Sequence, residues 1–135
     1  MAMCAENDNV VDYDGGWKMV DESVIDAFQM MWGKFPEGVM LIDKSRHILA
    51  VNAACATLGF AEGMICSKMG SPESHRGCLA NKALAEQKAK FRKISMDGKE
   101  FVSFWVPVVG QDNIFLHFTV GMMVDYGISE ETIEN

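Results

Sequence analysis

The stretch FRKISMDGKEFVSFWVPV, residues 91–108, decides the fold class of this 135-residue chain. Two runs rich in aromatic and β-branched residues, 91–96 and 101–108, flank the dipeptide Asp97-Gly98, which is typical of the two-residue turn of a β-hairpin. A further turn leads into residues 114–123, where apolar and polar residues alternate. We therefore expect three consecutive antiparallel strands, with one apolar face on the last that comprises Ile114, Leu116, Phe118, Val120 and Met122.

The sequence before this hairpin predicts two more short strands and a helical middle. Apolar runs at 39–42 and 47–51 flank a turn-forming tetrapeptide, which is the pattern of a second hairpin. Asn52 is a suitable N-cap for a helix over residues 53–58. Ser71-Pro72 has the residue types of a helix start, so we expect a second helix from there to about residue 88.

An amphipathic helix is predicted for residues 20–34. Its apolar side chains recur at three- and four-residue spacing, and Pro36 ends it because proline lacks a backbone N–H. The apolar stripe is larger than a lone surface helix needs, and such patches usually mark an interface. We therefore expect a homodimer through Val24, Phe28, Met31 and Trp32. The alternative is that the stripe only covers the open face of the helix's own sheet.

Length and composition indicate one packed domain with acidic ends. Hydrophobic residues make up 49% of the chain, and the net charge is -7. Residues 1–26 carry a net charge of -6 and residues 125–135 carry -4, which disfavours binding to nucleic acid. No apolar run approaches the ~20 residues that cross a bilayer, and no signal peptide is recognisable, so we expect a cytoplasmic protein without a membrane segment. The four cysteines form no Cys-x-x-Cys pair, and we expect free thiols.

Several short motifs follow one another in a specific order and spacing over residues 35–125. They are Phe35-Pro36-Glu37-Gly38-Val39, Asp43 through Ile48 to Asn52, Ala53-Ala54 through Leu58-Gly59-Phe60, Pro72-Glu73-Ser74-His75-Arg76 and Asp97-Gly98. With these motifs the segment resembles a PAS domain, a small sensory module of signalling proteins. The resemblance implies an α+β fold, namely a five-stranded antiparallel sheet with helices over one face, preceded here by the amphipathic helix.

Two positions depart from the family pattern. Arg46 stands in the first hairpin turn where the family commonly has Gly, and Asp125-Tyr126-Gly127 replaces its closing Asp-Ile-Thr. The expected organisation is a flexible acidic leader, an N-terminal helix, the PAS-like domain and an acidic tail. Their bounds are residues 1–19, 20–34, 35–125 and 126–135.

The resemblance implies a pocket between the sheet and the middle helices. On a helix that begins at Pro72, His75 shares a face with Cys78 and Leu79, so all three are expected to point inward. Imidazole is an axial ligand of haem iron, and haem-binding members of the family place such a histidine on the corresponding helix. The cofactor is left open, with haem on His75 as one possibility. The expected pocket residues are His75, Met69, Cys78, Leu79, Cys55, Leu58, Met40, Ile94, Phe104 and Phe118.

The cysteines and histidines of the expected pocket could also bind a metal other than haem iron. Cys55, Cys66 and Cys78 with His75 could hold zinc or an iron–sulfur cluster, but their spacing matches no standard pattern and buried inert thiols are favoured. His117 lies out of phase with the Ile114 face and is expected to face solvent. The high methionine content is interpreted as a Met-tolerant core.

The sequence contains no Ser-His-Asp order, paired-carboxylate motif or phosphate-binding loop, so we expect no catalysis. The predicted function is that of a sensory module that binds a small ligand or cofactor in an apolar pocket. It would relay binding through dimerisation or contact with a signalling partner protein. Two alternatives remain. One is a structural dimerisation module whose core is filled by its own Met and Phe side chains, and the other is a haem or redox sensor that uses His75.

Overall fold

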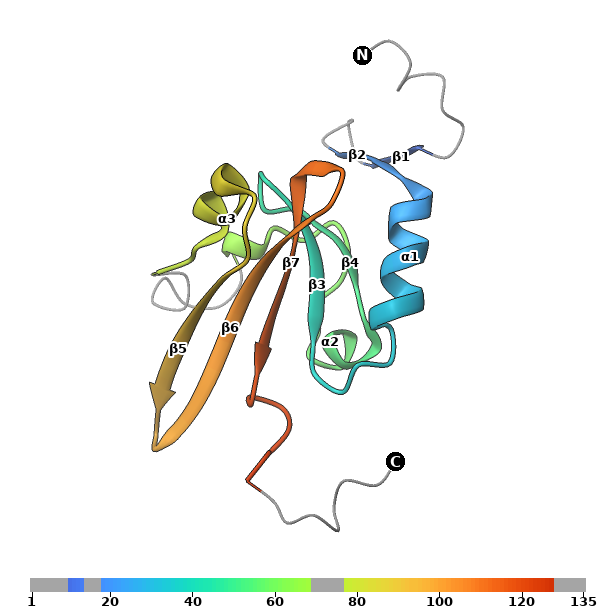
Figure 1. The fold of residues 1–135 in the computed structure, drawn as a ribbon. Helices are drawn as coiled ribbons and strands as arrows, with labels where there is room; N and C mark the ends of the chain where they lie inside the picture. The colour runs from blue at the N-terminus through green and yellow to red at the C-terminus, as the bar shows by residue number, and fades with distance from the viewer. Residues whose placement is uncertain (1–9, 14–17, 69–76, 128–135) are drawn as a thin grey trace.

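A five-stranded antiparallel sheet forms the centre of the molecule (Figure 1). The computed structural model describes residues 10–13, 18–68 and 77–127. The strand order across the sheet is β4-β3-β7-β6-β5, and every neighbouring pair is antiparallel. The predicted α+β class with a five-stranded sheet is confirmed. The strands are β3 (Val39–Asp43), β4 (Ile48–Val51), β5 (Lys90–Met96), β6 (Lys99–Val108) and β7 (Gln111–Val120).

Helices cover both faces of this sheet. Helix α1 (Glu22–Trp32) packs on one face, against a cluster of buried residues that includes Leu41 and Leu49. The opposite face is covered by the segment between β4 and β5, which contains α2 (Ala53–Thr57), the 3-10 helix η3 (Cys66–Lys68) and α3 (Ala80–Glu86). Two hydrophobic cores therefore form, one on each side of the sheet. No helix within the described ranges is long and apolar enough to cross a membrane.

The amphipathic pattern correctly predicts α1, but its main apolar residue serves the core. The Asp21 carboxylate caps the helix by accepting a hydrogen bond from Ser23 N at 2.9 Å. Phe28 is only 3% exposed and belongs to the cluster around Leu41, so it is not available to a second copy. The dimer expectation is therefore wrong at this residue. Phe28 instead fits the alternative, in which the apolar stripe of the helix covers the open face of its own sheet.

Turn chemistry explains both predicted hairpins. Between β5 and β6, Asp97 and Gly98 have φ values of 51° and 77°, as the two-residue turn requires. Between β3 and β4, the Asp43 carboxylate accepts hydrogen bonds from Ser45 N and His47 N at 2.9 and 3.0 Å. Arg46 in this turn has φ 75°, in the left-handed region that favours glycine. The backbone thus keeps the glycine-like conformation although the side chain is arginine.

Two predictions about local structure need correction. The leader was expected to lack regular structure, but β1 (Val10–Tyr13) pairs with β2 (Lys18–Asp21) as an antiparallel ribbon. The helix expected from residue 71 to 88 does not run through residues 77–79, and α3 begins only at Ala80. Gly77 has φ 83°, and a Cβ atom there would collide with the Arg92 guanidinium, so the chain passes this point in a conformation that a helix cannot adopt.

Candidate functional site

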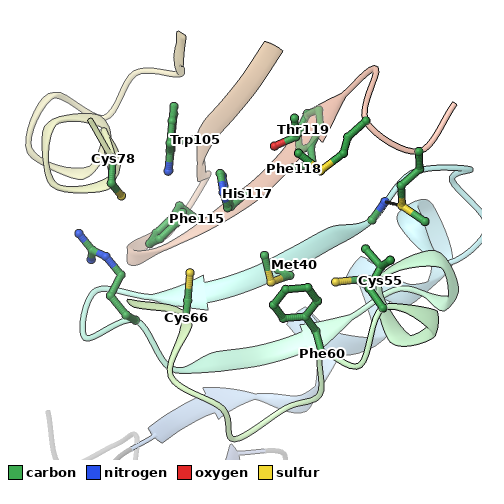
Figure 2. A pocket seen from close by; sticks show the side chains of 15 residues that line it. Met40, Cys55, Phe60, Cys66, Cys78, Trp105, Phe115, His117, Phe118 and Thr119 are labelled. Carbon is green, nitrogen blue, oxygen red and sulfur yellow. Dashed lines mark hydrogen bonds between the residues drawn. The ribbon is translucent and has the colours of Figure 1, made fainter. Parts of the chain in front are cut away.

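A cavity of about 350 Å³ lies between the sheet and the segment that carries α2 and η3 (Figure 2). Strands β3, β6 and β7 contribute one side of it, and residues of α2, of the segment from α2 to η3, and Cys78 contribute much of the other. The volume falls in the range of small-molecule sites, about 300–1,000 Å³. The lining residues are Gly38, Met40, Arg46, Cys55, Leu58, Phe60, Cys66, Cys78, Trp105, Phe115, His117, Phe118, Thr119, Met122 and Met123.

The sheet side of the cavity carries an imidazole and a hydroxyl pair. His117 stacks on Trp105, with ring centroids 4.9 Å apart and planes at 17°. Its Nδ1 lies 2.9 Å from the carbonyl oxygen of Phe104, a geometry that fits an Nδ1–H donated to that oxygen. Two residues further along β7, the Thr119 hydroxyl is 2.7 Å from the Ser103 hydroxyl. Polar hydrogen-bonding groups thus sit side by side on an otherwise apolar wall.

Asn52 fixes the opposite side of the cavity, because it ties α2 to the start of β3. Its Oδ1 accepts hydrogen bonds from Val39 N and Cys55 N, both at 3.0 Å, and its Nδ2 donates to Glu37 O at 2.9 Å. Cys55 is thereby pressed against Gly38, where a Cβ atom would come within 3.3 Å of it. The predicted N-cap of α2 therefore also determines where the first cavity thiol lies.

Three cysteines that line the cavity are free thiols. Burial raises the pKa of Cys55 to about 11, with a smaller contribution from Cys66. Burial also raises the pKa of Cys66, Cys78 adds to this, and the nearby Arg46 guanidinium opposes it. Both thiols are therefore protonated near neutral pH and neither is an activated nucleophile. Within the described part of the chain, no group of three or more His, Cys, Asp or Glu residues is placed to hold a metal ion.

Arg46 occupies one end of the cavity and is held in place by the protein. It donates hydrogen bonds to Lys44 O at 2.7 Å and to Asn81 Oδ1 at 2.9 Å. Its guanidinium also lies 5.7 Å from the centroid of the Phe115 ring. The bond to Asn81 connects the first hairpin turn to α3.

The other end of the cavity is closed by the chain that leaves β7. The Glu37 side chain is fully buried, and its Oε2 accepts a hydrogen bond from Gly121 N at 2.7 Å. Its Oε1 accepts from Met122 N and Met123 N at 3.1 and 2.9 Å. We call this arrangement the Glu37 clamp. It fixes the backbone of two residues whose side chains line the cavity, and the sequence analysis did not single out Glu37 as a site residue.

The structure brings together only part of the predicted pocket. Met40, Cys55, Leu58, Cys78 and Phe118 line the cavity. Phe104, Leu79 and Ile94 do not. Phe104 alternates with the cavity residue Trp105 along β6, and its ring stacks on Phe118, which borders the cavity, with ring centroids 5.1 Å apart. Leu79 packs against the buried cluster around Ala80, and Ile94 lies on β5 opposite Phe101, away from the lining.

His75 and Met69 lie outside the described residues, so haem ligation by His75 stays a prediction. The argument that placed His75, Cys78 and Leu79 on one helix face is wrong for the last two, since both precede α3. His117 was expected to face solvent, but it lines the cavity. The predicted alternation of side chains along β7 was correct, but the face that carries His117 was wrongly assigned to solvent. Trp105, on which His117 stacks, is the residue whose position in the sequence could have indicated which face of the sheet lines the cavity.

The arrangement of the elements matches known structures. The PAS domain of BvgS from Bordetella pertussis aligns with a TM-score of 0.55 at 16% identity, over 72% of this chain and 85% of that one. A PAS domain from Colwellia psychrerythraea aligns with a TM-score of 0.53 at 19% identity, over 71% and 94%. The chain has the PAS fold. A sensory box histidine kinase from Vibrio cholerae also shares this PAS fold, with a TM-score of 0.53 at 8% identity over 73% and 88%.

At these identities the PAS fold is what the structural likeness establishes. No family model matches the sequence, and no curated protein matches it either. The cavity described above lies on the face of the PAS sheet opposite α1, where the resemblance implied a pocket.

Proposed function

We propose that this domain is a sensory module of a cytoplasmic signalling protein, which binds a small molecule in the cavity and passes the change to its flanking segments. One observation carries the proposal. Met122 and Met123 line the cavity, and the Glu37 clamp holds the backbone of the same two residues where the chain leaves the sheet. A ligand that fills the cavity would contact these side chains and bias the position of the segment that follows β7.

A second contact supports a relay toward α1. The Phe118 ring borders the cavity and lies 5.4 Å from Trp32, the last residue of α1, and 6.3 Å from Phe35. Movement of Phe118 would therefore reach the end of the N-terminal helix through direct ring contact. The fold neighbours include a PAS domain of BvgS and a sensor histidine kinase, in line with a sensory role.

We propose no catalytic step for the domain. The cavity thiols of Cys55 and Cys66 are held protonated by burial, and the imidazole of His117 is stacked and bonded to a backbone carbonyl. Dimerisation or contact with a signalling partner would use the outward side of α1. Met30 and Met31 are 80% and 68% exposed there, whereas Phe28 is buried.

A ligand screen with a structural readout tests the proposal. The wild-type protein is screened by thermal shift against a fragment set with aliphatic, aromatic and charged members, and hits are followed by amide hydrogen exchange. At ten times its Kd a ligand stabilises the fold by about 1.4 kcal/mol. We expect hits to change exchange at the amides of Gly121, Met122 and Met123. Exchange in the β1–β2 ribbon, which contributes no residue to the lining, should stay unchanged.

A cavity-filling variant provides the control. Cys66→Phe places a ring into the cavity from η3 and should abolish binding of the hits. Met96→Phe introduces the same residue at a half-exposed position on β5, outside the lining, and should bind them like wild type. If no fragment binds the wild-type protein, or if every hit still binds Cys66→Phe, the sensory proposal is contradicted. A structural module with a self-filled core would then be favoured.

A further inference from the structure

The side chains around the cavity are of two unusual kinds. Six of the fifteen lining residues carry sulfur, and five carry an aromatic ring if His117 is counted. Leu58 is the one branched aliphatic residue among them. The sulfur-bearing group is Met40, Cys55, Cys66, Cys78, Met122 and Met123, and the aromatic group is Phe60, Trp105, Phe115, His117 and Phe118.

This composition is local to the cavity. The core on the α1 face is built mostly from aliphatic residues such as Val39, Leu41 and Leu49, and no methionine is among the buried core residues of the described chain. Met40 and Met64 are partly buried and pack against the core cluster on the cavity face, so the interpretation as a Met-tolerant core holds for these two residues. Met40, Met122 and Met123 line the cavity, while Met30 and Met31 lie exposed on α1.

Thioethers and rings recognise one shape of ligand best. A methionine sulfur makes favourable contacts with the edge of an aromatic ring, and aromatic walls such as Trp105 and Phe115 favour stacked or edge-to-face rings. Aliphatic side chains would serve a saturated ligand equally well, but they are almost missing from the lining. The volume of about 350 Å³ lies at the small end of the range for ligand sites, which limits the ligand to one or two rings.

The polar groups of the cavity call for a single hydrogen-bonding group on that ligand. One hydroxyl of the Thr119–Ser103 pair donates to the other, so the accepting hydroxyl can still donate its own O–H and the pair keeps acceptor lone pairs. The thiols nearby are uncharged near neutral pH, and the Arg46 guanidinium is bonded to Lys44 O and Asn81. Both acceptors bound to Arg46 are uncharged, so its guanidinium keeps its positive charge at one end of the cavity.

We propose that the ligand of this cavity is a flat aromatic molecule of one or two rings with one hydroxyl or equivalent hydrogen-bonding group. The inference rests on the proposed ligand-binding function and narrows it to a chemical class. It predicts that the cavity binds an aromatic molecule more tightly than a saturated molecule with the same carbon skeleton.

Two probes test this prediction, 1-naphthol and its saturated counterpart decahydro-1-naphthol. They share the carbon skeleton and the hydroxyl, and the saturated probe exposes more apolar surface, so the hydrophobic effect alone favours it. We expect calorimetry on the wild-type protein to give at least tenfold tighter binding of 1-naphthol. Equal or tighter binding of decahydro-1-naphthol would overturn the aromatic class and leave ligand binding intact. Absence of binding by both probes would overturn the inference together with the proposed function.

Removing the sulfur tests its part in the preference. A Met40→Leu, Met122→Leu, Met123→Leu triple variant keeps the lining apolar and close to its original volume. We expect its preference for 1-naphthol to fall at least threefold. Met96→Leu makes the same change outside the cavity and should keep the wild-type ratio of the two Kd values. An unchanged ratio in the folded triple variant, checked by circular dichroism, would overturn the role of the thioethers.

Discussion

Replacing Glu37 with alanine removes the acceptor of three backbone N–H groups at once. Hydrogen bonds to a charged group contribute about 1.5–3 kcal/mol each, and an N–H left buried without a partner costs about 1–3 kcal/mol. The three N–H groups of the Glu37 clamp are partly buried, so water can replace some of the lost bonds. We therefore expect Glu37→Ala to lower the free energy of unfolding by about 3–5 kcal/mol, a large share of the roughly 5–15 kcal/mol of a typical domain.

Glu37→Gln separates the lost acceptor from the lost side chain. The amide keeps one oxygen, which can still accept from Met122 N and Met123 N, but it turns an NH₂ group toward Gly121 N. We expect a loss of about 2 kcal/mol, between wild type and Glu37→Ala. Glu100→Gln is the matched control, because Glu100 forms an exposed ion pair with Lys93 and should change stability by about 0.5 kcal/mol or less.

Urea unfolding followed by tryptophan fluorescence measures these differences. Trp32 and Trp105 lie in the two cores, so the signal reports both sides of the sheet. Hydrogen exchange adds a local readout, since the amides of residues 121–123 should lose protection in Glu37→Gln even at urea concentrations where the protein stays folded. A Glu37→Ala variant within 1 kcal/mol of wild type, or no different from Glu100→Gln, would refute the clamp as a stabilising contact.

Four further predictions concern the thiols, α1 and haem. The free energy of unfolding should fall as the pH rises from about 9 to 11, because the unfolded Cys55 thiol loses its proton near pH 9 and the folded one near 11; urea titrations of Cys55→Ala should lack this part of the fall. Alkylation of the native protein at pH 8, mapped by mass spectrometry, should modify exposed Cys78 well before Cys55, and equal rates would contradict the burial of Cys55. Phe28→Ala should destabilise the fold by about 3–5 kcal/mol, whereas only Met31→Ser should alter the mass by light scattering if α1 forms a dimer. If the protein takes up haem, the Soret band should change in His75→Ala; an identical spectrum in the two proteins would remove His75 from the site.

The sequence predicted the elements whose signals are local. Asp97-Gly98 specifies its hairpin because the turn itself needs two residues with positive φ, and α1 follows from one apolar stripe. The helix start at Ser71-Pro72 was also a local signal, but the conformation at Gly77 prevents a helix from running on into α3. The pairing of β1 with β2 had no signal, because that part of the chain lacks alternation of apolar and polar residues.

The candidate site was predictable only as far as faces could be assigned. Met40 and Cys55 were placed by the expected fold, and both line the cavity. Phe104 and His117 were assigned to the wrong faces of the sheet, because the alternation along a strand separates two faces but does not indicate which of them lines a cavity. Glu37 could not be found by pattern at all, since its three partners lie more than eighty residues away along the chain.

The Glu37 clamp also fixes where the domain is entered and left. The chain enters β3 at Val39, two residues after Glu37, and leaves β7 at Val120, directly before the residues bound to its carboxylate. The two junctions therefore lie within hydrogen-bond distance of each other. A change in the cavity that moves residues 121–123 would therefore reach the chain at one point on both sides of the sheet, before β3 and after β7.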